Sequence, residues 1–180
     1  MIFIRTFLFL VFTLFVVPSL AAEEAAPFGF EIGTDTLMSS RTKATERGYA
    51  HKIDGENKYT GGLMLDIDVS SAQVNGVKKL ILIFDQQEIL QGVTFDSRKH
   101  HFNDFDGFIS QKYVPVKRQV PFVGNKYVEY QAPNAIIKLN APHMGFEMNI
   151  VYASQELLSS FNSISKAEDA QEKKKAASQF

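Results

Sequence analysis

The chain has 180 residues, no cysteine, 45% hydrophobic residues and a formal net charge of −1. This composition suits one domain with an apolar core, and it excludes disulfide bonds, thiolate metal sites and a cysteine-linked lipid anchor. The near-neutral charge also argues against nucleic acid as a partner, because nucleic-acid binding requires a basic surface.

Residues 1–21 have the three parts of a cleavable secretory signal peptide. Arg5 supplies the positive charge, residues 7–17 form the apolar run, and Pro18 ends that run before a small-residue cleavage site. We expect cleavage between Ala21 and Ala22, leaving 18 basic and 20 acidic side chains. The sequence thus predicts Sec-type export to the bacterial periplasm or the cell exterior, without a stable membrane anchor after cleavage.

The expected domain begins with a leader, a strand and a helix. Residues 22–26 are expected to form a flexible leader, and residues 27–33 alternate apolar and polar side chains as a strand does. The next residues offer side-chain oxygens for capping a helix that should cover residues 37–47. Gly48 should end this helix, because glycine tolerates the left-handed conformation at a helix C-terminus.

The rest of the domain, which should end near residue 165, is expected to be rich in strands. Phe102 and Phe105 have the spacing of the apolar face of a second helix. Ser154 can cap a third helix, and residues 166–180 should form a charged, solvated tail. Strands are expected at residues 63–69, 77–85, 89–95, 116–121, 126–131, 135–140 and 146–153.

These elements predict an α+β domain, in which helices pack on one face of an antiparallel sheet. Their order further suggests a tandem duplication of a helix-plus-β-meander unit, at residues 34–97 and 98–153 of the domain 27–165. Both halves contain the triplet Asn-Lys-Tyr. The features that we match between the halves are Tyr49 with Tyr113, residues 57–59 with 125–127, and residues 80–84 with 146–150.

Two segments resemble a known class of envelope protein. Residues 30–36 read as an apolar strand leading to a helix, and residues 80–93 read as two strands of a meander. Together they resemble the small BamE/SmpA-type envelope domains, and the tandem arrangement resembles the architecture of the β-lactamase inhibitory protein. The resemblance implies a protein-binding scaffold. The BamE family is lipid-anchored through a cysteine, which this chain lacks.

The segment between the second helix and residue 133 contains the candidate binding residues. It mixes cationic and aromatic side chains with prolines, and such side chains on a loop or an edge strand are common in interface hot spots. The alternative is that Tyr127 and Tyr130 simply pack on the sheet, as aromatic residues often do. The candidates are Lys117, Arg118, Phe122, Tyr127 and Tyr130.

Candidate catalytic and metal-binding chemistry is sparse. His100 and Asp104 would share a helix face and could hold a metal, although they equally suit a solvated helix start. Asp66 and Asp68 alternate on one face of a strand, where carboxylates usually face solvent. We therefore expect no catalytic residue and no cofactor.

These observations lead to three hypotheses about function. The first is an exported, non-catalytic binding or accessory protein that contacts an envelope protein through the open face or an edge of its sheet. The second is a carrier that holds a small apolar ligand between sheet and helices, and a ligand-sized cavity would favour it. The third is a hydrolase-type enzyme, which would need a cleft where a histidine and a carboxylate converge.

Overall fold

The computed structural model describes residues 23–179, and its centre is an antiparallel sheet built from alternating strands. In β3, for example, Leu80, Leu82 and Phe84 are fully buried while the residues between them are partly exposed. The predicted signal peptide and its cleavage site lie outside the described residues. In spatial order the eight strands are β1 (His51–Glu56), β2 (Gly61–Asp68), β3 (Lys79–Asp85), β4 (Leu90–Arg98), β8 (Glu147–Ala153), β7 (Ile136–Ala141), β6 (Lys126–Gln131) and β5 (Val114–Gln119).

The strand order divides the sheet into two four-stranded meanders, each preceded by a helix. α1 (Leu37–Glu46) precedes β1 to β4, and α2 (Phe102–Ser110) precedes β5 to β8. The last strands of the two meanders, β4 and β8, pair in seven consecutive positions and join the units. The predicted α+β fold class is therefore confirmed, and a helix-plus-meander unit occurs twice along the chain.

The positions of the matched sequence features follow this repeat, with one correction. Tyr49 lies two residues before β1 and Tyr113 one residue before β5. The first Asn-Lys-Tyr triplet lies in the β1–β2 turn, and the second spans the start of β6. Matching the strand at residues 80–84 with residues 146–150 is wrong. The counterpart of β3 is β7, whereas β8 corresponds to β4. Both β3 and β8 are apolar central strands, so hydrophobicity alone did not distinguish them.

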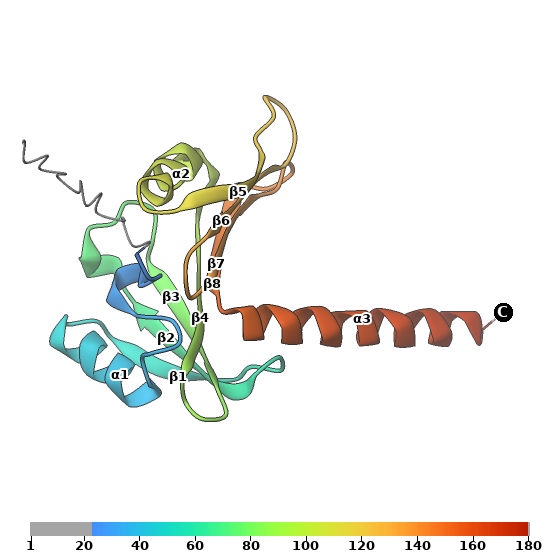
Figure 1. Ribbon diagram of the computed structural model, residues 1–180, viewed down its shortest axis with the longest axis horizontal. Helices are drawn as coiled ribbons and strands as arrows, with labels where there is room; N and C mark the ends of the chain where they lie inside the picture. The colour runs from blue at the N-terminus through green and yellow to red at the C-terminus, as the bar shows by residue number, and fades with distance from the viewer. Residues whose placement is uncertain (1–22, 180) are drawn as a thin grey trace, which may run out of the picture.

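α1 and α2 cover the same face of the sheet, and the core lies between them and the strands (Figure 1). Leu82, Val93 and Leu139 point from the central strands into this core, where Phe102 and Phe105 of α2 are also buried. Contacts between aromatic rings connect the two halves through Phe95. Burial of this apolar surface is the main stabilising contribution to the fold.

The third helix, α3 (Gln155–Ala177), departs from the predicted packing of the helices on one face: it starts on the opposite face, which we call the open face, and projects away from it (Figure 1). Ser154 caps it by accepting a hydrogen bond from the Leu157 amide at 3.1 Å, as predicted. Leu157 is buried, whereas the predicted charged tail continues as exposed helix. No described helix, α3 included, is both long and apolar enough to cross a membrane.

The predicted strand at residues 27–33 is wrong. Pro27–Gly29 forms a 3₁₀ turn, in which Phe28 and Gly29 have positive φ angles of 53° and 76°. Phe30 and Ile32 are buried, as the alternating pattern implied, but they reach the core from an irregular segment. Period-two alternation thus identified the buried side chains here without identifying the backbone conformation.

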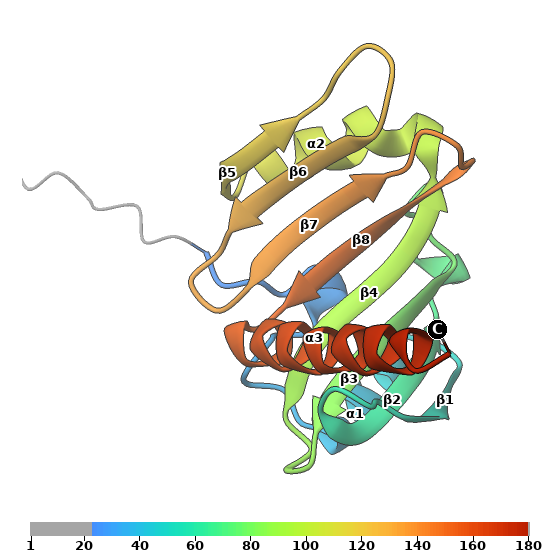
Figure 2. The ribbon, with the colours of Figure 1, turned by 90° about the vertical axis from the view of Figure 1, so that its right-hand side faces the viewer.

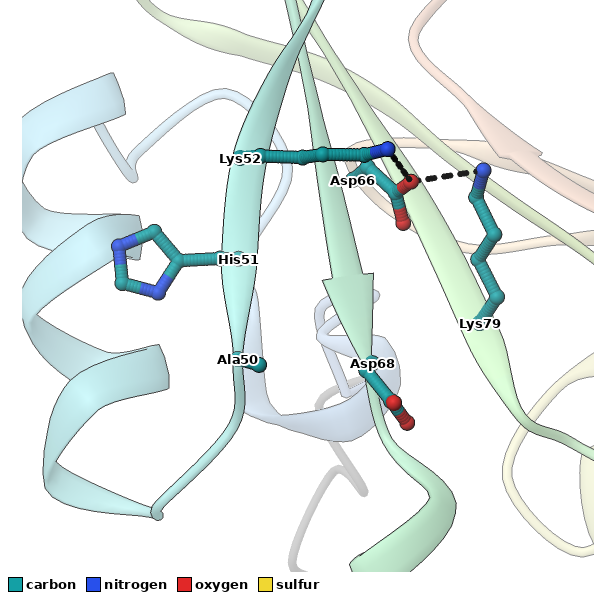
Figure 3. A pocket seen from close by; sticks show the side chains of 6 residues that line it. All are labelled: Ala50, His51, Lys52, Asp66, Asp68 and Lys79. Atoms are coloured by element: carbon teal, nitrogen blue, oxygen red, sulfur yellow. Dashed lines mark ion pairs between the residues drawn. The ribbon is translucent and has the colours of Figure 1, made fainter.

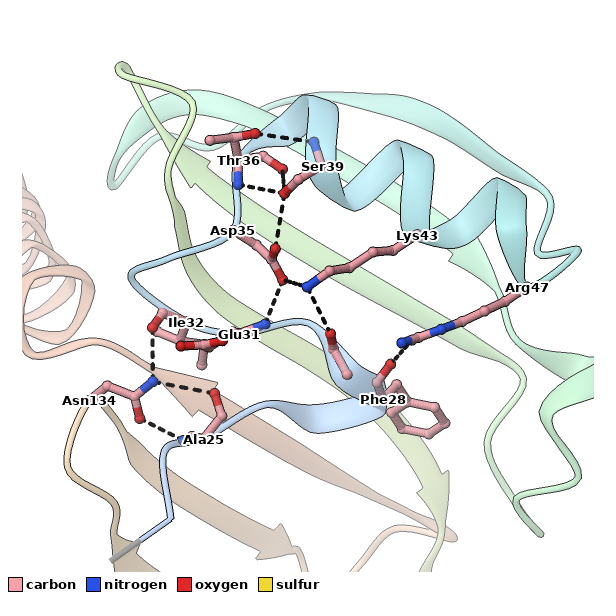
Figure 4. Close-up of polar contacts among 11 residues, drawn as sticks. Ala25, Phe28, Glu31, Ile32, Asp35, Thr36, Ser39, Lys43, Arg47 and Asn134 are labelled. Carbon is pink, nitrogen blue, oxygen red and sulfur yellow. Dashed lines mark hydrogen bonds and ion pairs between the residues drawn. The ribbon is translucent and has the colours of Figure 1, made fainter. Parts of the chain in front are cut away.

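The leader that we expected to be flexible is fixed to the domain from residue 23. Ala25 is fully buried, and its amide donates to the Asn134 side chain at 2.6 Å. Asn134 also donates to the carbonyl of Ile32 at 2.8 Å, so one side chain ties two N-terminal segments to the β6–β7 turn (Figure 4). The Tyr113 hydroxyl donates to the carbonyl of Glu24.

A capping box begins α1 and confirms the predicted helix start. The Thr36 side chain accepts from the Ser39 amide at 3.1 Å, and the Ser39 hydroxyl accepts from the Thr36 amide at 2.9 Å. These two bonds satisfy amide groups that a helix start otherwise leaves free (Figure 4). The helix ends at Glu46, two residues before Gly48 with its φ of +71°.

Candidate protein-binding surface

Two loops lie side by side at one end of the sheet. The β5–β6 loop covers residues 120–125, and the β7–β8 loop covers residues 142–146. Because β6 pairs with β7 from Lys126↔Ala141 onward, both loops leave the sheet at the same end. The His143 amide donates to the Asn125 side chain at 2.7 Å and links the two loops. Figure 2 shows both extending beyond this end of the strands.

The two loops expose four large apolar side chains, which we call the loop tip: Phe122, Val123, Met144 and Phe146. Their exposed fractions are 103%, 67%, 93% and 91%, respectively. Burying a side chain of this size is worth about 1.5–3 kcal/mol, so leaving four of them in water forgoes a large stabilisation. Large apolar side chains that are exposed together on adjoining loops are typical of interaction sites.

Hydrogen bonds from Lys99 to backbone carbonyls hold the β7–β8 loop in place. The Lys99 ammonium donates to the carbonyls of Pro142 and His143 at 2.6 and 2.9 Å, and the Lys99 amide donates to the carbonyl of Phe146 at 2.9 Å. A surface loop that is held in this way loses little conformational freedom when it binds. The part of the loop tip on the β7–β8 loop is therefore preorganised for binding.

The predicted binding residues separate into three groups, of which only Phe122 lies in the loop tip. Lys117 and Tyr127 are on the open face, where the Lys117 ammonium lies 5.4 Å from the centre of the Tyr127 ring. The Tyr127 hydroxyl donates to Glu129. These two residues are accessible, but they contact each other and not the loop tip.

Arg118 and Tyr130 form the third group and bind a buried carboxylate. Asp106 of α2, only 9% exposed, accepts from the Arg118 guanidinium at 3.0 Å and from the Tyr130 hydroxyl. Burial, together with the hydrogen bond to Asp106, raises the pKa of Tyr130 to about 12. Because both side chains are engaged in this network, their role in the structure is to hold α2 against β5 and β6.

The histidine–aspartate cluster lies where a 3₁₀ turn, Lys99–His101, leads into α2. His101 approaches Asp104, with 3.2 Å between Nδ1 and Oδ2. Among residues 23–179 no group of three histidine or acidic side chains is arranged to hold a metal ion.

Asp66 and Asp68 line a hollow on the open face with Lys52 and Lys79 (Figure 3). Asp66 is only 8% exposed, yet its carboxylate lies 2.8 Å from the Lys79 ammonium and 3.9 Å from that of Lys52. The hydrogen bond to Asp66 raises the pKa of Lys79. This arrangement neutralises a nearly buried carboxylate, and it does not favour proton transfer.

The described residues place a hydroxyl, an imidazole and a carboxylate near one another beside Gly76. Ser97 Oγ and His101 Nε2 both approach the position that a Gly76 side chain would occupy, and His101 contacts Asp104. The Ser97 hydroxyl is buried and has no hydrogen-bond partner among residues 23–179. An activated nucleophile needs a bonded base and access to substrate, which this hydroxyl lacks.

No family model, curated protein or solved structure matches the chain. The resemblance to BamE/SmpA-type domains stays an expectation from sequence. Function is therefore inferred from the surface of the molecule, where the loop tip is the clearest departure from an ordinary solvated face.

Proposed function

We propose that this chain is an exported, non-catalytic binding or accessory protein, which contacts another protein of the bacterial envelope through its loop tip. The observation that carries the proposal is the exposure of Phe122, Val123, Met144 and Phe146 on two adjoining loops. Aromatic and methionine side chains at the centre of a patch are the usual anchors of protein interfaces. The signal-peptide pattern at residues 1–21 supports export.

The arrangement of the charged side chains supports binding over catalysis. Asp66 and Asp106, the least exposed carboxylates outside the N-terminal segment, each lie beside a cation. The layer between the sheet and α1 and α2 is occupied by fully buried side chains such as Phe84 and Phe102. That filling gives no support to a ligand held in this layer.

Site-specific photo-crosslinking in the native envelope tests the proposal. A photoreactive phenylalanine at position 122 or 146 should crosslink to one discrete envelope protein. The same residue at position 108 is the matched control, because Phe108 is also exposed, at 61%, but lies on α2. Phe122→Ser combined with Phe146→Ser should leave the thermal melting curve unchanged and reduce crosslinking from position 123 at least tenfold.

Two results would overturn the proposal. The first is equal crosslinking from positions 122 and 108, which would show that contact is not specific to the loop tip. The second is that the photoreactive residue at position 122 crosslinks to lipid alone and that the purified protein sediments with phosphatidylglycerol vesicles. The loop tip would then contact a membrane and not a protein.

A further inference from the structure

A groove on the open face lies between α3 and the sheet, away from the loop tip. Its floor contains Ile83, Val151 and Ala153, and its wall contains Leu157 and Phe161 of α3. The cavity volume is about 340 Å³, within the range of small-molecule sites. Figure 1 shows α3 projecting away from the sheet, so the groove lies between the start of this helix and the strands.

Contacts at two points hold α3 over this groove. Near its start, Leu157 packs directly on Gly92 of β4, where an added side-chain carbon would lie 2.6 Å from the leucine. Further along, the Phe161 ring lies 4.9 Å from the Tyr59 ring of the β1–β2 turn. Lys58 of the same turn forms an ion pair with Glu168 at 2.8 Å. The β1–β2 turn thus lines one end of the groove with Tyr59 and Asn57.

The opposite end of the groove carries a positive charge. Lys138 of β7 lines it, and its ammonium forms no ion pair with any residue between positions 23 and 179. Glu129 stands opposite Lys138 on β6 and accepts a hydrogen bond from the Tyr127 hydroxyl, so an anionic carboxylate lies near the Lys138 ammonium without forming an ion pair with it. Asn149 and Thr94 add polar groups to the floor beside Lys138. Each end of the groove thus has an ammonium group nearby, but Lys58 is paired with Glu168 whereas Lys138 has no ion pair within the part of the chain that the structure describes.

We propose that this groove binds a single-chain amphiphile with a carboxylate head, a free fatty acid. The carboxylate lies at Lys138, and the hydrocarbon chain lies under α3 against Val151 and Ile83 and reaches Tyr59. From β7 to β3 the groove spans three strand spacings, roughly 14 Å, which matches an extended saturated chain of medium length. This site is separate from the loop tip, and either proposal can fail without the other.

Calorimetric titration of the purified mature protein with dodecanoate, dodecanol and dodecyltrimethylammonium tests the assignment. We expect dodecanoate to bind most tightly and the ammonium compound least. Lys138→Met keeps the length of the side chain and removes its charge. It should weaken dodecanoate binding about fivefold and leave dodecanol binding unchanged, as expected for a partly exposed ion pair.

Val151→Trp should fill the floor of the groove and abolish binding of both dodecanoate and dodecanol. Lys126→Met is the matched control, because Lys126 lies over the Phe102 ring, outside the groove, and should bind like the wild type. Circular dichroism and melting curves establish that each variant folds. The assignment is overturned if dodecanoate does not bind, if it binds equally well to Val151→Trp, or if Lys138→Met leaves its affinity unchanged.

Discussion

Asp35 lies directly before the capping box of α1 and binds residues on both sides of it. Its side chain is only 6% exposed, and its carboxylate accepts from the Lys43 ammonium at 2.7 Å, the Glu31 amide at 2.7 Å and the Ser39 hydroxyl at 2.9 Å. Burial by itself would raise the pKa of Asp35. The hydrogen bonds to Lys43, Glu31 and Ser39 outweigh burial and hold that pKa below its usual value.

The direction of this shift predicts how stability changes with pH. Because the folded-state pKa of Asp35 lies below the unfolded value, ionised Asp35 stabilises the fold above the unfolded pKa. That contribution is lost as the pH falls through the folded pKa. Asp35→Asn should lower the free energy of unfolding by about 1.5–3 kcal/mol at neutral pH, and the difference should shrink near pH 3.

Urea denaturation at both pH values, followed by circular dichroism, measures this effect. Asp169→Asn is a suitable control, since Asp169 is exposed on α3 and its replacement should change little. A difference between wild type and Asp35→Asn that stays constant down to pH 3 would show that Asp35 charge does not stabilise the fold.

At the scale of elements, the position of α3 depends on a glycine. Gly92 faces α3 on β4, and its missing side chain lets Leu157 approach the strand. Gly92→Val should push the first turn of α3 away from the sheet, because the new methyl groups would occupy the volume of Leu157. Hydrogen exchange should then become faster in residues 155–165 and stay unchanged in β2, β3 and β7.

A second glycine provides the comparison. Gly107 lies inside α2, and an added side-chain carbon there would meet no atom within 4 Å. Gly107→Ala should therefore stabilise the protein by about 0.5–1 kcal/mol through helix propensity and leave exchange in α3 as it is. If hydrogen exchange in α3 is as slow in the Gly92→Val variant as in the wild type, Leu157 does not fix the helix.

The sequence predicted those elements whose side chains alternate between core and solvent. β2 was predicted in this way, because Leu65 repeats at period two with its neighbours, whereas β3 was predicted from the continuous apolar run at residues 80–84. β1 was missed as a strand. It lies at the edge of the sheet and is almost wholly exposed, so its polar side chains carry no such pattern.

The candidate site was predictable only in part. Phe122 stood out because it is an aromatic residue in a turn, but Met144 and Phe146 join it through the pairing of β6 with β7. That pairing is a long-range register, which local sequence does not determine. Arg118 was placed at the interface for its residue type, and its binding to Asp106 required the packing of α2 to be known.

At the scale of the whole molecule, one core serves both units. Phe95 of β4 is 5% exposed, and its ring lies 5.6 Å from that of Phe28, 5.9 Å from that of Phe105 and 6.4 Å from that of Tyr152. Phe95 therefore contacts the N-terminal segment, α2 of the second unit, and β8, the strand that pairs with β4 and joins the units. A residue in this position couples the two meanders.

Phe95→Ala should lower the free energy of unfolding by about 3–5 kcal/mol, because it leaves a cavity between the units. Both units should still unfold in one transition, observed at the same urea concentration by circular dichroism and tyrosine fluorescence. Phe108→Ala, at an exposed position on α2, should cost far less. Two separate transitions in the wild type would show that the meanders have independent cores.

The two hairpins that begin the meanders occupy equivalent places, and α3 contacts the first of them. The β1–β2 turn is covered, with Tyr59 against Phe161 and Lys58 paired to Glu168. The β5–β6 loop, its counterpart, leaves Phe122 and Val123 in solvent. A repeated chain could offer two docking points, but here the C-terminal helix occupies the first. The expected stoichiometry is thus one partner molecule for each chain.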